Sequence, residues 1–75
     1  MKLREARSRK LLSAAKLAKQ AGISEGNIYK IEHGDWLPSL GNVKKMADVL
    51  GMDPMEVDEF KAAIEKSSRK GTENE

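Results

Sequence analysis

Residues 13–32, SAAKLAKQAGISEGNIYKIE, predict a short helix, a tight turn and a second short helix. Ser13 and Ser24 precede these helices and are placed to cap them, because a serine hydroxyl accepts a hydrogen bond from an unpaired N–H of the first turn. Gly22 follows the first helix, where a positive φ costs glycine nothing sterically. Two isoleucines three residues apart give the second helix an apolar face. This order of features is typical of a motif that lays one helix across a DNA backbone and the next in the major groove.

The chain is short, charged and free of cysteine. Its 75 residues suffice for one small domain, and an excess of Lys, Glu, Ala and Leu over β-branched residues favours an all-α fold. Since the chain has no cysteine and one histidine, we expect no disulfide, no metal site and no cofactor. A charged amino terminus and the lack of a long apolar run predict no signal peptide, no membrane span and a cytoplasmic location.

Charge is unevenly distributed along the chain. Residues 1–34 carry eight Lys or Arg against three Glu, a net charge of +5. Residues 35–75 carry six basic against nine acidic residues, a net charge of −3. The basic half contains the two-helix pattern, as expected if that pattern meets the phosphates of DNA.

Periodicity and capping signals predict five helices and no internal repeat. Their expected ranges are Leu3 to about Leu12, about Ala14 to Gln20, about Glu25 to His33, Ser39 to Leu50, and a fifth that begins after Asp53 with Pro54 and Glu56 completing its cap. The expected inward residues are Leu3, Ala6, Leu11, Leu17, Ala18, Ile28, Ile31, Leu40, Val43, Met46, Ala47, Leu50, Val57, Phe60 and Ile64. We therefore expect one domain, residues 1–66, followed by a flexible polar tail, residues 67–75.

These residues together resemble the Cro/C1-type helix-turn-helix family, or XRE family, over roughly Leu3 to Val57. The matching pieces, in order, are Leu3…Arg7, Ser13…Leu17-Ala18, Gly22-Ile23-Ser24, Ile28…Ile31-Glu32-His33-Gly34, Pro38-Ser39-Leu40 and Val43…Met46-Ala47…Leu50-Gly51. The resemblance implies a compact all-α bundle of five helices of the lambda-repressor-like type. Most members of the family bind operator DNA as transcriptional regulators.

The resemblance also implies which residues meet DNA. The candidates are Ser13 and Lys16 at the start of the second helix, and Ser24, Glu25, Gly26, Asn27, Tyr29 and Lys30 on the third. Asn27 can pair with adenine, and Lys30 can donate to guanine or to a phosphate. Glu25 can accept from a cytosine amino group or serve the helix dipole alone. Tyr29 can contact a thymine methyl group or a phosphate, or simply cover the domain surface.

Three positions depart from the pattern of the family. Ala14 stands where members often carry Gln, and Gly26 either permits close approach of the backbone to DNA or is neutral. The loop after the third helix, often basic, here contains Asp35 and Trp36. Asp35 should weaken phosphate binding. Trp36 can donate its indole N–H to DNA or contact a protein, but we favour packing over the edge of the core.

Arg7 and Glu32 have a structural role according to the resemblance. The matching residues of the family form an ion pair that holds the first and third helices together. Removal of one partner from such a half-buried pair costs far more than replacement of both.

The sequence thus predicts a sequence-specific DNA-binding transcriptional regulator, a repressor that binds a palindromic operator as a homodimer. The expected dimer surface contains Met52, Met55, Phe60 and Ile64, although Met55 and Phe60 fit a core equally well. The alternative is a protein-interaction adaptor or an antitoxin with the same fold, favoured by Ala14, Gly26 and Asp35. We expect no enzyme, because the sequence offers no nucleophile motif, His–carboxylate cluster or phosphate loop.

Overall fold

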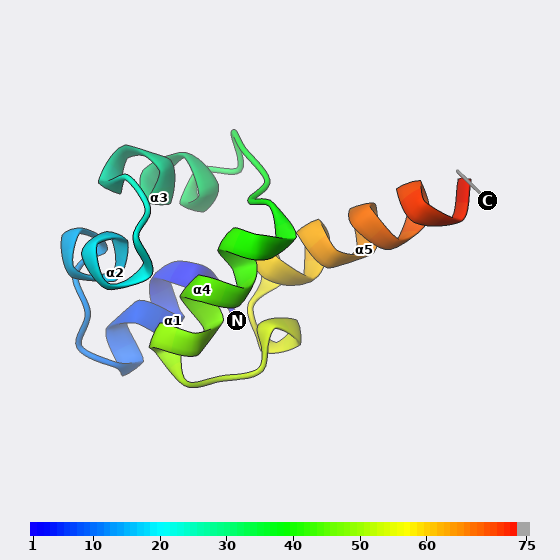
Figure 1. Cartoon of the computed structure of the whole chain (residues 1–75). Coiled ribbons are helices and arrows are strands. Elements are labelled where there is room, and N and C mark those ends of the chain that lie inside the picture. Colours follow the sequence, from blue (N-terminus) through cyan, green and yellow to red (C-terminus); the bar gives the residue numbers. More distant parts are fainter. Residues whose placement is uncertain (74–75) are drawn as a thin grey trace.

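The computed structural model describes residues 1–73, and for residues 68–73 the backbone only. The helices are α1 (Leu3–Arg9), α2 (Ala14–Ala21), α3 (Glu25–Glu32), α4 (Leu40–Leu50), the 3₁₀ helix η1 (Pro54–Glu56) and α5 (Asp58–Glu73), as Figure 1 shows. No strand occurs in this part of the chain, so the predicted all-α fold with five α-helices is confirmed.

The helix-turn-helix pattern folds as its local sequence predicts. The hydroxyl of Ser13 accepts from the N–H of Lys16 at 3.1 Å, and that of Ser24 accepts from the N–H of Asn27 at 3.2 Å. Gly22 ends α2 with a φ of 72°, a left-handed conformation that lets the chain turn sharply into α3. These contacts fix the start of both helices and the turn that joins them.

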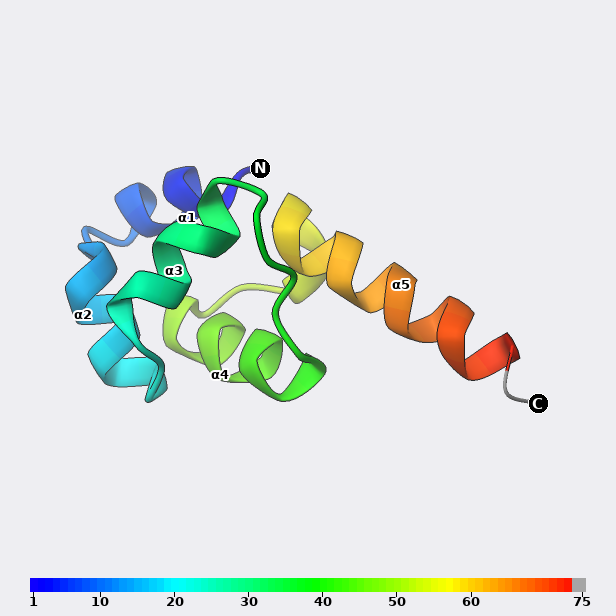
Figure 2. The same cartoon turned by 90° about the horizontal axis from the view of Figure 1, so that it is seen from above.

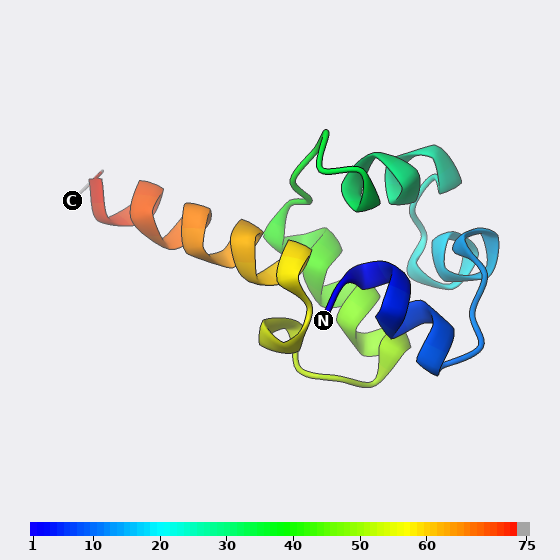
Figure 3. The same cartoon turned by 180° about the vertical axis from the view of Figure 1, so that it is seen from behind.

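A single apolar core joins the helices. α2 packs on α3 and α4, and α4 packs on α5 and η1. The largest fully buried side chains are Phe60, Leu3, Leu17, Ile28, Ile31, Met46, Leu50 and Val57. Helices α1 to α4 form one body, from which the C-terminal half of α5 extends away (Figures 2 and 3). The core therefore holds α5 from its start to Ile64 but not its far end.

The start of α1 is tied to the start of α5. The N–H of Leu3 donates to Oε1 of Glu59 at 2.8 Å, and the N–H of Asp58 donates to the carbonyl of Met1 at 2.7 Å. An unpaired N–H at the beginning of α1 is thus capped by a residue from the opposite end of the domain.

Two residues expected to face inward do not. Leu11 is 89% exposed, because α1 ends at Arg9 and the chain then turns with a φ of 56° at Leu11. The N–H of Leu12 closes this turn by donating to the carbonyl of Arg7 at 2.9 Å. Leu40 is 49% exposed, because it is the first residue of α4 and lies beyond the buried stripe of that helix.

The fifth helix begins later than we predicted. Asp53 and Glu56 form the expected capping box. The helix that begins there, Pro54–Glu56, is a single 3₁₀ turn. Val57 is extended and fully buried, and this interruption separates η1 from α5. The expected polar tail is helical through Glu73, while residues 74 and 75 lie outside the described residues.

Candidate nucleic-acid interface

Helix α3 presents one continuous outward face. Ile28 and Ile31 are buried, which turns the opposite side of the helix to solvent. Residues four apart lie on neighbouring turns of the same face. The structure therefore brings together the five predicted α3 residues, of which Glu25, Gly26, Tyr29 and Lys30 are exposed and Asn27 is half-buried.

Tyr29 and Glu25 form one unit on this face. The Tyr29 hydroxyl donates to Oε2 of Glu25 at 3.0 Å, one helical turn earlier. This hydrogen bond, together with the negative charge of Glu25, raises the pKa of Tyr29. Because the phenol proton is engaged, Tyr29 offers mainly its ring to a ligand, and Glu25 keeps its second oxygen as a free acceptor.

The predicted contacts at the helix starts have a structural role as well. Ser13 and Ser24 accept hydrogen bonds from α2 and α3, yet each hydroxyl can still donate its own proton to a phosphate. Lys16 is exposed in the first turn of α2, where unpaired N–H groups also favour an anion. The start of α2 is thus chemically suited to a phosphate contact.

An ion pair holds α3 in place. Nε of Arg7 donates to Glu32 at 2.6 Å and Nη2 donates to the other carboxylate oxygen at 3.1 Å, with both side chains almost fully covered. Nη1 donates to the carbonyl of Leu12 at 3.1 Å, so the same guanidinium also ties the turn before α2. The hydrogen bond to Glu32 raises the pKa of Arg7 against the opposing effect of burial. The predicted pair is thus present and fixes α3 against α1.

Gly26 is not required by the fold. Its φ lies in the ordinary helical range, unlike that of Gly22, Gly34 and Gly51. A Cβ at Gly26 would meet only the Ser24 hydroxyl, at 3.7 Å. An alanine side chain would therefore fit the protein itself at this position.

The loop after α3 returns beside the outward face. Gly34 has a φ of 82°, its N–H donates to the carbonyl of Ile31 at 3.1 Å, and the N–H of Asp35 donates to the carbonyl of Lys30 at 2.9 Å. These two bonds close the end of the helix in the Schellman arrangement. Asn27, Lys30, Asp35 and Trp36 consequently line one open hollow.

Trp36, for which we favoured packing over the edge of the core, is partly covered. It remains 36% exposed and lines the hollow beside Asn27 and Lys30. The sequence signal for this placement was Gly34, because a glycine that closes a helix end brings the next residues back along its last turn.

The residues expected at the dimer surface differ in exposure. Phe60 is fully buried and belongs to the core, which confirms the core alternative for this residue. Met52 and Ile64 are partly buried and pack against that core. Met55 remains as an exposed apolar side chain on η1.

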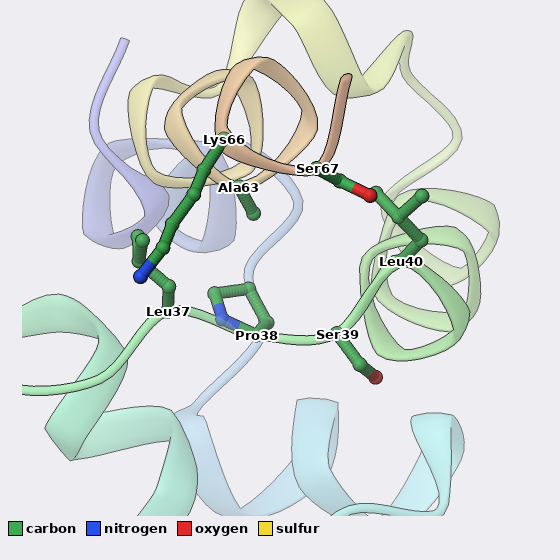
Figure 4. Close-up of a pocket in the computed structure, with 7 residues that line it drawn as sticks. All are labelled: Leu37, Pro38, Ser39, Leu40, Ala63, Lys66 and Ser67. Carbon is green, nitrogen blue, oxygen red and sulfur yellow. The ribbon is translucent and has the colours of Figure 1, made fainter. Parts of the chain in front are cut away.

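A second hollow lies where the segment before α4 meets α5. Its lining residues are Leu37, Pro38, Ser39, Leu40, Ala63, Lys66 and Ser67, and the Lys66 side chain runs toward Leu37 (Figure 4). This hollow is separate from the outward face of α3 and shares no lining residue with the first hollow.

Comparison with known families agrees with this arrangement. Residues 1–60 match a family model described as a helix-turn-helix domain. The matched range contains α1 to α4, η1 and the first residues of α5. No curated protein and no solved structure matches the chain. Within the described residues, no helix is both long and apolar enough to cross a membrane.

Proposed function

Since the chain belongs to the helix-turn-helix domain family, we propose that it is a sequence-specific DNA-binding transcriptional regulator of the Cro/C1 type. The observation that carries this proposal is the outward face of α3. That face presents an amide at Asn27 and an ammonium group at Lys30, on a helix that Ser24 caps and the Arg7–Glu32 pair holds in place.

Recognition would place α3 in the major groove. Asn27 has the donor and acceptor needed for the edge of adenine, and Lys30 can donate to guanine N7 and O6. Each well-formed pair of this kind discriminates against a wrong base by about 1–3 kcal/mol. The start of α2, with Ser13 and Lys16, would bind a phosphate and so set the orientation of the domain.

Regulation would follow from occupation of an operator. A domain of this size touches too few base pairs for high specificity alone, so we propose that two copies bind a palindromic site. A bound pair can repress by covering a promoter, without chemistry, cofactor or metal. Such a role would place the protein in the cytoplasm, together with its operator DNA.

The test is a binding selection on randomised duplex DNA at near-physiological salt, followed by sequencing. We expect a palindromic consensus with half-sites about one helical turn apart. Weak, salt-sensitive binding without an enriched motif would contradict the proposal.

A second candidate function is a protein-interaction adaptor or an antitoxin component. The exposed Leu37 and Leu40 beside the second hollow favour it, since they could contact a protein. An adaptor should bind DNA weakly and without sequence preference, so the same selection separates it from a regulator. A neighbouring toxin gene would favour the antitoxin.

A further inference from the structure

Four residues with polar groups line the hollow at the end of α3. Asn27 and Lys30 come from α3, and Asp35 and Trp36 come from the loop that follows. Among the residues whose side chains the structure describes, none forms a hydrogen bond or an ion pair with these four side chains. The four residues that line this open space carry an amide, an ammonium group, a carboxylate and an indole N–H, which are groups that can bind a polar ligand.

Asp35 is held rigidly at this place. Its N–H is bonded to the carbonyl of Lys30, and Gly34 completes the closure of the helix. Because α3 is itself fixed by Arg7 and Glu32, the Asp35 backbone is fixed with respect to the whole outward face. A ligand that lies along α3 would therefore find the Asp35 carboxylate within one side-chain length of a fixed backbone position.

The charge of Asp35 restricts what it can bind on DNA. A carboxylate only accepts hydrogen bonds, and it is repelled by phosphates. In the major groove the strong donors are the exocyclic amino groups, N4 of cytosine and N6 of adenine. Among the base edges of the major groove, these amino groups therefore offer Asp35 its favourable contacts.

We propose that Asp35 is a specificity-determining residue that accepts a hydrogen bond from the exocyclic amino group of one operator base, inside the hollow that Trp36 borders. This inference rests on the proposed DNA-binding function and extends it beyond α3. It assigns opposite effects to one side chain. Asp35 weakens binding to DNA of any sequence and strengthens the preference for one base pair in each half-site.

The experiment compares the full chain with two variants in the selection described above. Asp35→Ala removes the carboxylate from the hollow, and Asp48→Ala removes an exposed carboxylate from α4, which gives a matched change of net charge. For Asp35→Ala we expect tighter binding to random duplex and a loss of preference of about five-fold or more at one base pair. For Asp48→Ala we expect every preference to persist.

Base analogues identify the amino group directly. The selected adenine is replaced by purine, or the selected cytosine by 2-pyrimidinone, so that only the amino group is lost. The wild-type protein should then bind as if that position were unspecific, and Asp35→Ala should not distinguish the two duplexes. The analogue that produces this result shows whether the contacted base is cytosine or adenine.

Two results would overturn the inference and can be told apart. If the wild-type protein selects a motif and Asp35→Ala changes affinity for all sequences by one factor, Asp35 is only a surface charge and the regulator proposal stands. If the wild-type protein selects no motif, the proposed function fails first. Thermal melts of both variants monitor folding, which the exposed Asp35 side chain should not affect.

Discussion

The starts of α3 and α4 share one sequence pattern and differ in what surrounds it. Residues 24–27 are Ser-Glu-Gly-Asn and residues 39–42 are Ser-Leu-Gly-Asn. In each, the serine hydroxyl accepts from the asparagine N–H at 3.2 Å. A Cβ on either glycine would meet only the serine oxygen, at 3.7 and 4.0 Å. The pattern therefore starts a helix at both places but does not define its function.

Helices α3 and α4 differ in the contacts that hold them in the domain. Helix α3 is fixed to α1 by a charged pair and turns its polar side outward, beside the Asp35 hollow. Helix α4 is fixed by an apolar stripe of Val43, Met46, Ala47 and Leu50. Substitutions within the shared Ser-x-Gly-Asn starts should thus affect the two helices alike in stability and differently in DNA binding, whereas the contacts beyond these starts should differ in stability as well.

The largest effect is expected where the two helices are held differently. Glu32→Ala leaves the covered Arg7 guanidinium unpaired and should destabilise the fold by about 3 kcal/mol. Asp48→Ala, on the solvent side of α4, should change the free energy of unfolding by less than about 0.5 kcal/mol. Denaturant unfolding of both variants measures their free energies of unfolding. Equal effects would mean that the ion pair does not hold α3.

Next in size is the contrast between the two asparagines. Asn27→Ala should weaken binding to the selected operator by about 10- to 100-fold, because a bidentate base contact is lost. Asn42 is half-buried like Asn27 and also lies three residues after its capping serine. Asn42→Ala should change the affinity for the operator less than about three-fold. Titration of labelled operator with each variant gives the dissociation constants. A matching loss for Asn42→Ala would remove the special role of α3.

A smaller effect is expected at the glycines. Gly26→Ala and Gly41→Ala should each stabilise the fold by about 0.5 kcal/mol, since both sites accept a Cβ and alanine favours a helix. If the α3 backbone approaches base edges closely, only Gly26→Ala should also weaken operator binding. Thermal melts and operator titrations of the same two proteins test both parts. Unchanged affinity for Gly26→Ala would make that glycine neutral.

The smallest effect concerns Tyr29, whose counterpart on α4 is Lys44. Tyr29 is the sole tyrosine, so absorbance during an alkaline titration reports its pKa alone. We expect a pKa above the ordinary value of 10.0, and Glu25→Gln should lower it again. The hydrogen bond favours the neutral phenol, so its contribution to stability is present below pH 10 and is lost as pH rises through the folded pKa. An unchanged pKa in Glu25→Gln would exclude this pairing in solution.

Local features were predictable from the sequence and tertiary ones were not. The caps at Ser13, Ser24 and Ser39 depend on neighbours within three residues, and each is present. Leu11 was misplaced because periodicity does not reveal where a helix stops, and its turn uses a leucine where glycine is usual.

The candidate site shows the same division. The outward face of α3 follows from the isoleucine spacing, and the position of Arg7 beside Glu32 follows from the family resemblance. The hollow beside that face, however, requires the loop at Gly34 to return along α3. Phe60 was equally ambiguous between core and surface until α5 was set against α4.

The bond between Leu3 and Glu59 bears on how the chain folds during its synthesis. Those two residues are 56 positions apart, and Leu3 is fully buried. Helices α2 and α3 can pair as soon as both have left the ribosome, because their contacts are local. The first turn of α1, made earliest, must wait for its capping partner until α5 emerges. The domain therefore completes its hydrogen bonds last at the seam between α1 and α5, and a pause in translation before residue 59 would leave the N–H of Leu3 without this partner.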